Sequence, residues 1–258
     1  MMGLRERCGL KSILFLLACS FVLIGDLANA ADDYGQAGEL LKRVDHIRFP
    51  SGGYQVDVTI TTTDPGSEPD VHAYRILSKG NDKTLVKTTA PAIDRDQILL
   101  MRERDLWAFL PNLSQPIRLP LSQRLTGQVA NGDLARANFS GDYKPQVLRK
   151  DTMEGQVYYV LQLDAVDSWV TYHRVLLWVN AKNDRPYKAE FYPLSGRLLK
   201  TCYYQNFKAL GGVQRPTNLV IEDALRSGSR SVLDYSNLVE RDLPDKVFTK
   251  DYLKKLSR

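Results

Sequence analysis

The sequence predicts a mainly β protein of the α+β class, with one antiparallel sheet and few helices. Many short runs show the period-2 alternation of half-buried strands, and turn residues rather than helix-length segments separate them. Helical patterns are confined to the two ends of the region after residue 30 and to one central segment. Consecutive strands joined by short turns favour an antiparallel meander over βαβ units. No repeat or flexible linker divides residues 31–258, so we expect one domain there.

The first expected element is an amphipathic helix over residues 37–47. Its apolar residues recur at helical spacing and polar residues lie between them. Pro50 and the pair Gly52-Gly53 end the pattern. The apolar positions are Ala37, Leu40, Leu41, Val44 and Ile47.

Strands follow the helix almost without interruption. In the first, Tyr54, Val56, Val58 and Ile60 alternate with polar residues. Further strands are expected at 71–78, 84–89, 97–102, 106–110, 117–119, 157–163, 172–179, 187–192, 198–207, 217–222 and 231–238.

Two other segments interrupt or follow the strands. Residues 121–138 have helix-spaced apolar residues broken by Gly127 and Gly132, which predicts short helical turns lying over the sheet. A short helix is expected at the C-terminus, with Thr249 as its N-cap and Phe248 packed on Leu253 as a hydrophobic staple.

Residues 1–30 have the three regions of a secretory signal peptide. Basic residues precede an apolar run at 13–24, and Ala28-Asn29-Ala30 provides an A-x-A cleavage site. We therefore expect a periplasmic product beginning at Ala31. The alternative is a lipoprotein anchored at Cys19, because residues 16–19 resemble a lipobox. Cleavage after residue 30 leaves Cys202 as the single cysteine, which we expect to be buried.

Composition and motifs give no support for several function classes. The 35 Lys and Arg against 30 Asp and Glu give a formal charge of +5 without a basic cluster, so nucleic-acid binding is not expected. His46, His72 and His173 lie far apart, so no metal site is expected. No nucleophile elbow, P-loop or dinucleotide motif is present, so we expect neither an enzyme nor a bound cofactor.

Several strands are apolar on both faces, as at 175–179 and 157–163. Either both faces of this part of the sheet are covered, or one face lines a cavity. From the pattern alone, a fully packed core without a ligand is the favoured interpretation.

An ordered set of short motifs resembles the outer-membrane lipoprotein-sorting protein family, over about residues 54–256. These motifs are ILLMRERDLWAFLP (98–111), IRLP (117–120), SQRLTGQ (122–128), NGDL (131–134), DY (142–143), LLWV (176–179), PYKAEFY (186–192), SG (195–196), LKT (199–201) and RPTN (215–218). The resemblance implies a LolA/LolB-like fold. That fold is an unclosed, strongly curved half-barrel with an N-terminal helix and helical lid segments over a hydrophobic cavity.

The resemblance also implies a function. Such proteins are monomeric periplasmic carriers of lipid or lipoprotein acyl chains, which exchange cargo with an inner-membrane transporter or an outer-membrane acceptor. The best-known carriers are shorter than this chain, and the segment 124–143 belongs to another branch. The cargo is therefore a lipoprotein, a free lipid or another amphiphile. The alternative is a periplasmic sensor of the same fold that acts through a protein partner in envelope-stress signalling.

Site residues follow from this implied cavity. Alternate residues of a strand face the same side of the sheet, and on this basis the expected lining residues are Trp107, Phe109, Tyr159, Leu161, Leu177 and Val179. In the lid segment, Gly127 and Gly132 would supply mobility. Arg124 and Asp133 would either contact the ligand or pair with each other to fix the segment.

Overall fold

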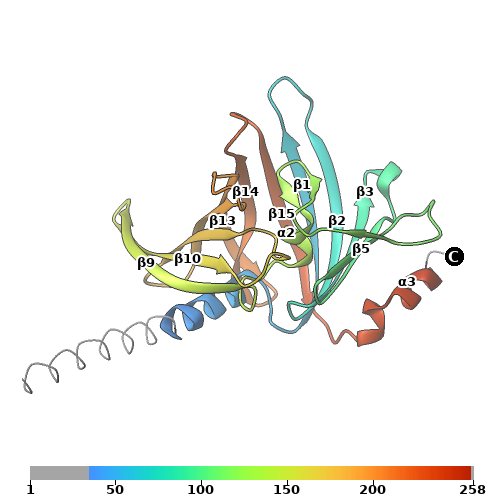
Figure 1. Ribbon diagram of the computed structural model, residues 1–258, viewed down its shortest axis with the longest axis horizontal. Coiled ribbons are helices and arrows are strands. Elements are labelled where there is room, and N and C mark those ends of the chain that lie inside the picture. The colour runs from blue at the N-terminus through green and yellow to red at the C-terminus, as the bar shows by residue number, and fades with distance from the viewer. Residues whose placement is uncertain (1–34, 257–258) are drawn as a thin grey trace, which may run out of the picture.

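The computed structural model describes residues 35–256, and its strands form one large curved antiparallel sheet (Figure 1). The predicted signal peptide and the alternative anchor at Cys19 lie outside the described residues. The chain is helical from residue 35 to residue 48, where the amphipathic helix was predicted. No helix among residues 35–256 combines the length and the apolar character needed to cross a membrane.

The sheet consists of two meanders. The first contains β1 (Gly53–Thr63), β2 (Asp70–Lys79), β3 (Lys83–Ala90), β4 (Ile98–Arg102), β5 (Asp105–Phe109) and β6 (Ile117–Leu119). The second contains β9 (Tyr143–Met153), β10 (Gln156–Ala165), β11 (Arg174–Asn180), β12 (Pro186–Tyr192), β13 (Lys200–Leu210), β14 (Val213–Asp223) and β15 (Arg230–Glu240).

The pairing of β1 with β15 joins the two meanders into one sheet of 13 strands. At this junction Tyr54 lies opposite Glu240 and Thr63 lies opposite Arg230. The two edge strands are β6 and β9, so the sheet is not closed. The predicted fold class, an unclosed and curved antiparallel sheet, is confirmed.

The main core lies on one face of the sheet, which we call the inner face; it carries Val58, Met101 and Leu177. The N-terminal helix covers part of this face with Leu41 and Val44, which are fully buried. In Figure 1 this helix (blue) runs beneath the part of the sheet that contains β9 and β10. The inner face is therefore a packed surface along most of its length.

The segment 121–138 covers the middle of the inner face. It forms a small hairpin of β7 (Arg124–Thr126) and β8 (Val129–Ala130), followed by the one-turn helix α2 (Asn131–Ala135). Leu121, Val129 and Leu134 are buried in the main core. The predicted helical turns over the sheet are thus present, with a hairpin in front of them. We call residues 121–138 the plug.

The opposite, outer face carries a second core where it meets the C-terminal elements, a 3₁₀ turn at Asp245–Phe248 (η2) and the helix α3 (Lys250–Leu256). Leu85, Ile98 and Leu100 pack there against Phe248 and Leu253. The predicted cap is confirmed, because the amide of Tyr252 donates to Thr249 Oγ1 at 3.3 Å. Strands β3 to β5 therefore pack apolar residues on both faces, which explains why these residues do not alternate with polar ones.

The strand β9 was not predicted. It is an edge strand and many of its side chains are exposed, so its residues lack the apolar alternation of an inner strand.

Candidate functional site

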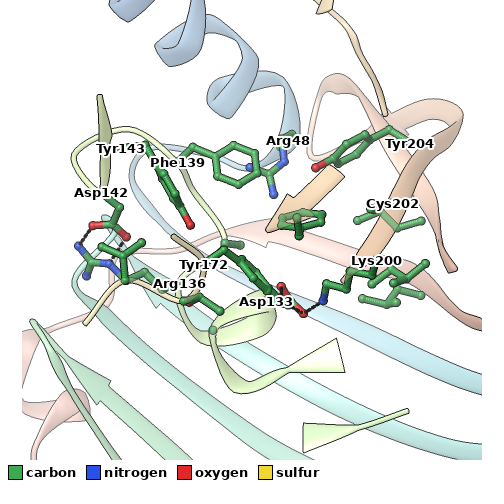
Figure 2. Close-up of a pocket in the computed structure, with 18 of the residues that line it drawn as sticks. Arg48, Asp133, Arg136, Phe139, Asp142, Tyr143, Tyr172, Lys200, Cys202 and Tyr204 are labelled. Atoms are coloured by element: carbon green, nitrogen blue, oxygen red, sulfur yellow. Dashed lines mark hydrogen bonds and ion pairs between the residues drawn. The ribbon is translucent and has the colours of Figure 1, made fainter. Parts of the chain in front are cut away.

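The candidate site is a cavity between the inner face of the second meander, the end of the N-terminal helix and the plug (Figure 2). The sheet contributes Phe191, Lys200, Cys202, Tyr204, Leu219, Ile221, Leu233 and Tyr235. The other walls are formed by Arg48, Gly132, Asp133, Arg136, Ala137, Phe139, Asp142, Tyr143, Val170, Thr171 and Tyr172. The cavity volume is about 40 Å³. It has room for roughly three water molecules, far less than an acyl chain needs.

Three polar residues, which we call the latch, hold α2 against the sheet: Asp133 on the plug, Lys200 on β13 and Tyr172 between them. Lys200 Nζ donates to Asp133 Oδ2 at 2.5 Å and to the carbonyl of Gln128 at 2.8 Å. The Tyr172 hydroxyl donates to Asp133 Oδ1 at 2.8 Å. Figure 2 shows the ion pair at the floor of the cavity. The latch therefore ties the plug directly to the sheet.

The latch is buried, and its surroundings keep the Tyr172 hydroxyl protonated. The Lys200 side chain is 3% exposed and that of Asp133 is 14% exposed. Burial, reinforced by the neighbouring Asp133 carboxylate, raises the pKa of Tyr172 well above its ordinary value, so its hydroxyl remains a donor. A buried ion pair adds little over a well-packed apolar contact, but the loss of one partner leaves an uncompensated charge. The latch therefore specifies the position of α2.

A second ion pair anchors the end of the plug. The guanidinium of Arg136 pairs with the Asp142 carboxylate and donates to the carbonyls of Asn81 and Glu103 at 2.6 and 2.9 Å. Burial raises the pKa of Asp142, and the hydrogen bonds from Arg136 oppose that rise. This pair joins the plug to turns of the first meander.

The N-terminal helix closes the top of the cavity through Arg48 and Asp45. The Arg48 guanidinium lies 4.3 Å from the centre of the Phe139 ring and 3.2 Å from Asp45 Oδ1. Asp45 in turn accepts hydrogen bonds from the amides of Phe139 and Ser140, at 3.0 and 2.7 Å. The helix and the segment after α2 are thus joined to each other over the cavity.

The predicted lining residues divide between the two faces. Leu161, Leu177 and Val179 are fully buried on the inner face, and Tyr159 is half-buried beside the N-terminal helix. All four belong to the core around the cavity, and none of them is among the described residues that line it.

Trp107 and Phe109 lie on the outer face, in the second core beneath α3. Their assignment to the inner face was wrong by one position, because Leu106 and Ala108 are the inward residues of β5. Both faces of this strand are apolar and covered, so hydrophobicity did not distinguish them.

The two glycines of the plug lie at close contacts with other segments. A Cβ atom on Gly127, whose φ is +50°, would lie 2.2 Å from Thr62 Oγ1, and one on Gly132 would lie 2.0 Å from Thr171 Oγ1. The structure thus accounts for both glycines by packing, and their predicted mobility remains a proposal. Arg124 is exposed, and Asp133 pairs with Lys200 instead of Arg124.

Sequence reasoning missed Lys200 and Tyr172. The sequence does contain a signal for Lys200. Side chains two positions apart on a strand lie on the same face, so a lysine in line with Cys202 and Tyr204 indicates a charge on the buried face. The buried thiol was predicted correctly: Cys202 is 3% exposed, and burial raises its pKa to about 12. A thiol with that pKa stays protonated and unreactive near neutral pH.

Comparison with solved structures gives a relative that decides the family. A LolA superfamily protein from Nitrosomonas europaea is 58% identical, covers 84% of this chain and 98% of its own, and superposes with a TM-score of 0.81. The chain belongs to the LolA superfamily.

Two more distant structures share the fold. A DUF1329 family protein from Desulfovibrio piger has 20% identity and a TM-score of 0.74. A Vibrio parahaemolyticus domain, described as an outer membrane lipoprotein-sorting protein domain, has 22% identity and a TM-score of 0.73. Each covers 86% of this chain and 99% of its own. A family model described as an uncharacterized protein matches residues 80–255. Comparison with curated proteins gives no match.

Proposed function

We propose that this LolA superfamily member is a non-enzymatic periplasmic carrier that binds the acyl chains of lipids or lipoproteins against the inner face of its sheet. It would receive cargo from an inner-membrane transporter or deliver it to an outer-membrane acceptor. The observation that carries the proposal is a polar latch holding a small plug over an apolar, curved sheet. The superfamily membership supports it.

Binding requires that the plug move. The cavity of about 40 Å³ is the closed state, in which α2 and its neighbours occupy the space above Phe191, Leu219 and Leu233. Displacement of the plug would uncover this apolar surface, and an acyl chain would cover it again. Each methylene removed from water contributes about 0.8 kcal/mol. A chain of ordinary length therefore compensates for the apolar contacts that the plug gives up.

The latch suits a reversible closure. Its carboxylate, ammonium and hydroxyl are polar groups that water can solvate once the plug has left. The hairpin with Gly127, together with Gly132, would move as one unit with the latch, and Arg124 would remain at its exposed rim. Export through the predicted signal peptide would place the protein in the envelope.

The test is native mass spectrometry of the gently purified protein, followed by loading with a palmitoylated peptide and with phosphatidylethanolamine. We expect bound lipid in the wild type, and faster loading in Asp133→Asn, which weakens the latch without changing its shape. The matched control is Asp184→Asn, because the Arg43–Asp184 pair lies on the surface. A protein that is always empty and takes up neither ligand would contradict the proposal.

The small volume of the closed cavity favours one alternative function. A sensor module of the same fold would need no space for a ligand and would act through a protein partner. In that case a membrane signalling partner would be retained on the protein whether or not lipid was present, and Asp133→Asn would not change any lipid uptake.

A further inference from the structure

The cavity beneath the plug, which we call the inner cavity, is lined by three polar groups that its ion pairs leave without a hydrogen-bond partner. These groups are the Nε atom of Arg48 and the hydroxyls of Tyr204 and Tyr235, for which the described residues provide no partner. Each side chain is less than a tenth exposed, with residue exposures of 8%, 5% and 7%. Buried polar groups are almost always hydrogen-bonded, so such a set indicates a site for water or for a ligand.

All three groups have a hydrogen to donate. A guanidinium donates and cannot accept, and a protonated phenol always carries one donor hydrogen. Burial raises the pKa of Tyr204 and of Tyr235, and the charge of Arg48 only partly opposes that rise, so both hydroxyls stay protonated. A ligand that fits these groups must therefore bring an acceptor.

The three donors reach the inner cavity from different elements. Arg48 is the last residue of the N-terminal helix, Tyr204 lies on β13 and Tyr235 lies on β15. The guanidinium carbon of Arg48 is 5.5 Å from the centre of the Tyr204 ring, and Figure 2 shows the guanidinium and the Tyr204 hydroxyl directed toward one another. None of the three belongs to the plug, so they would stay on the walls when the plug moves away.

The charges around these donors favour a neutral acceptor. Arg48 already has a counterion, because Asp45 Oδ1 lies 3.2 Å from its Nη1 atom. Displacement of the plug would separate two ion pairs and leave one cation, Lys200, and one anion, Asp142, on the walls. A carboxylate beside Arg48 would add a negative charge to walls whose charges already balance, whereas a carbonyl oxygen brings an acceptor and no charge.

Apolar side chains continue directly from the donors along the sheet. Leu219 lies opposite Tyr204 in the pairing of β13 with β14, and Leu233 lies opposite Leu219 in the pairing of β14 with β15. Both leucines line the inner cavity. A ligand with a carbonyl at the donors would therefore place the hydrocarbon attached to it on these leucines.

We propose that Arg48, Tyr204 and Tyr235 bind the ester carbonyl of an acyl chain, and that the cargo of this protein is a diacylglyceryl lipid. This inference rests on the proposed carrier function and adds the chemistry by which the cargo is recognised. The closed cavity, with about 40 Å³, has room for water at the donors, and a carbonyl oxygen can take the place of water and keep the hydrogen bonds.

The test compares ester-linked lipids with ether-linked lipids that have the same chains but no carbonyl oxygen. The purified full protein is loaded with an equimolar mixture of dipalmitoyl phosphatidylethanolamine and its dihexadecyl ether analogue, and native mass spectrometry gives the ratio of the two bound lipids. A second mixture contains a peptide with dipalmitoylglyceryl-cysteine at its N-terminus and the ether analogue of that peptide. We expect a preference for the ester of about tenfold, because the ether leaves buried donors unsatisfied.

The two mixtures distinguish the sources of the ester. A preference in both would support recognition of the ester in phospholipids and lipoproteins alike, and a preference in one mixture would support that source. Equal binding of ester and ether in both mixtures would overturn this inference and leave the proposed carrier function intact. Binding of neither form in either mixture would overturn both.

Two conservative variants test the donors themselves. Tyr204→Phe and Tyr235→Phe each remove one hydroxyl and keep the ring, so both should fold normally and lower the ester preference about threefold to tenfold. The matched control is Tyr187→Phe, because the Tyr187 ring lies outside the cavity, with its centre 5.0 Å from that of Tyr158 and 6.4 Å from that of Tyr203. An ester preference that is unchanged in both cavity variants would overturn the assignment of these donors.

Discussion

The sheet treats its apolar surface in two ways, one at the inner cavity and the other at a larger hollow on its outer face. This hollow lies between β2 to β5, the loop after β5 and the C-terminal elements, and we call it the outer groove. The inner cavity is nearly filled, with about 40 Å³ of space, and a buried ion pair holds its cover in place. The outer groove has about 550 Å³ and is bordered by the C-terminal elements, which pack on the outer face through Phe248 of η2 and Leu253 of α3. Closure on the inner side therefore depends on specific polar contacts, whereas none of the described side chains fills the hollow on the outer side.

The sharpest test of this difference removes the cation of the latch. In Lys200→Met the Asp133 carboxylate stays buried without its ion partner, and we expect the free energy of unfolding to fall by about 3–5 kcal/mol. The measurement is urea denaturation followed by circular dichroism. The double variant Lys200→Met/Asp133→Leu removes both charges and should recover part of the loss.

A surface pair provides the control for that experiment. Lys42 and Glu39 are 65% and 66% exposed, so Lys42→Met should change the unfolding free energy by less than about 1 kcal/mol. A similar value for Lys200→Met would mean that the latch contributes no more than a surface ion pair.

The next test compares packing on the two sides. Leu177 is fully buried on the inner face, so Leu177→Ala should lower the free energy of unfolding by about 2–5 kcal/mol. Phe109 is half-buried at the outer groove, so Phe109→Ala should cost under about 2 kcal/mol although it removes more atoms. Thermal and urea unfolding of the two variants measure this. A larger loss of stability in Phe109→Ala than in Leu177→Ala would show that the groove is a tightly packed core.

Cys202 reports on opening of the plug. It lines the inner cavity, and burial raises its pKa to about 12, so we expect the folded protein to react very slowly with a maleimide at pH 7. Asp133→Asn should increase the labelling rate about tenfold, corresponding to about 1.4 kcal/mol in the opening equilibrium. The readout is the mass of the peptide that contains Cys202.

The pH dependence of that labelling has a definite sign. If the thiol reacts in the closed state, its labelling rate should rise with pH up to the raised pKa of about 12. If the thiol reacts only after opening, the rate should rise only up to the ordinary thiol pKa near 9. A rate that levels off near pH 9 therefore indicates opening. Equal rates in the wild type and in Asp133→Asn would contradict control by the latch.

The smallest expected effect concerns the outer side. Thr249→Ala removes the oxygen that accepts from the Tyr252 amide, which should weaken α3 by about 1 kcal/mol. Hydrogen exchange should become faster in α3 and remain unchanged in α2. Faster exchange in α2 as well would mean that the two sides of the sheet are coupled.

Sequence patterns were sufficient for most of the fold, because period-2 alternation and turn residues mark strands that have one buried face. They failed for β9, whose residues are exposed on an edge, and for Trp107 and Phe109, whose strand is buried on both faces. In both cases the physical cause is the same: hydrophobicity alternates only where the two faces of a strand meet different environments.

The candidate site was less predictable than the fold. Asp133 was selected as a lid residue, but its partner Lys200 lies 67 positions away, across most of the second meander. Local spacing carries no information about such a pair. The identity of Lys200, a cation at a buried strand position, was the only sign of it in the sequence.

The junction between β1 and β15 has a consequence for how the protein is made. Because it pairs strands from opposite ends of the described chain, the continuous sheet cannot assemble until nearly the whole polypeptide is present. Contacts between such distant segments slow folding, since the chain entropy must be lost before the contact is gained. A chain that threads through a translocation channel would stay unfolded on the way, and only its last strand would complete the sheet.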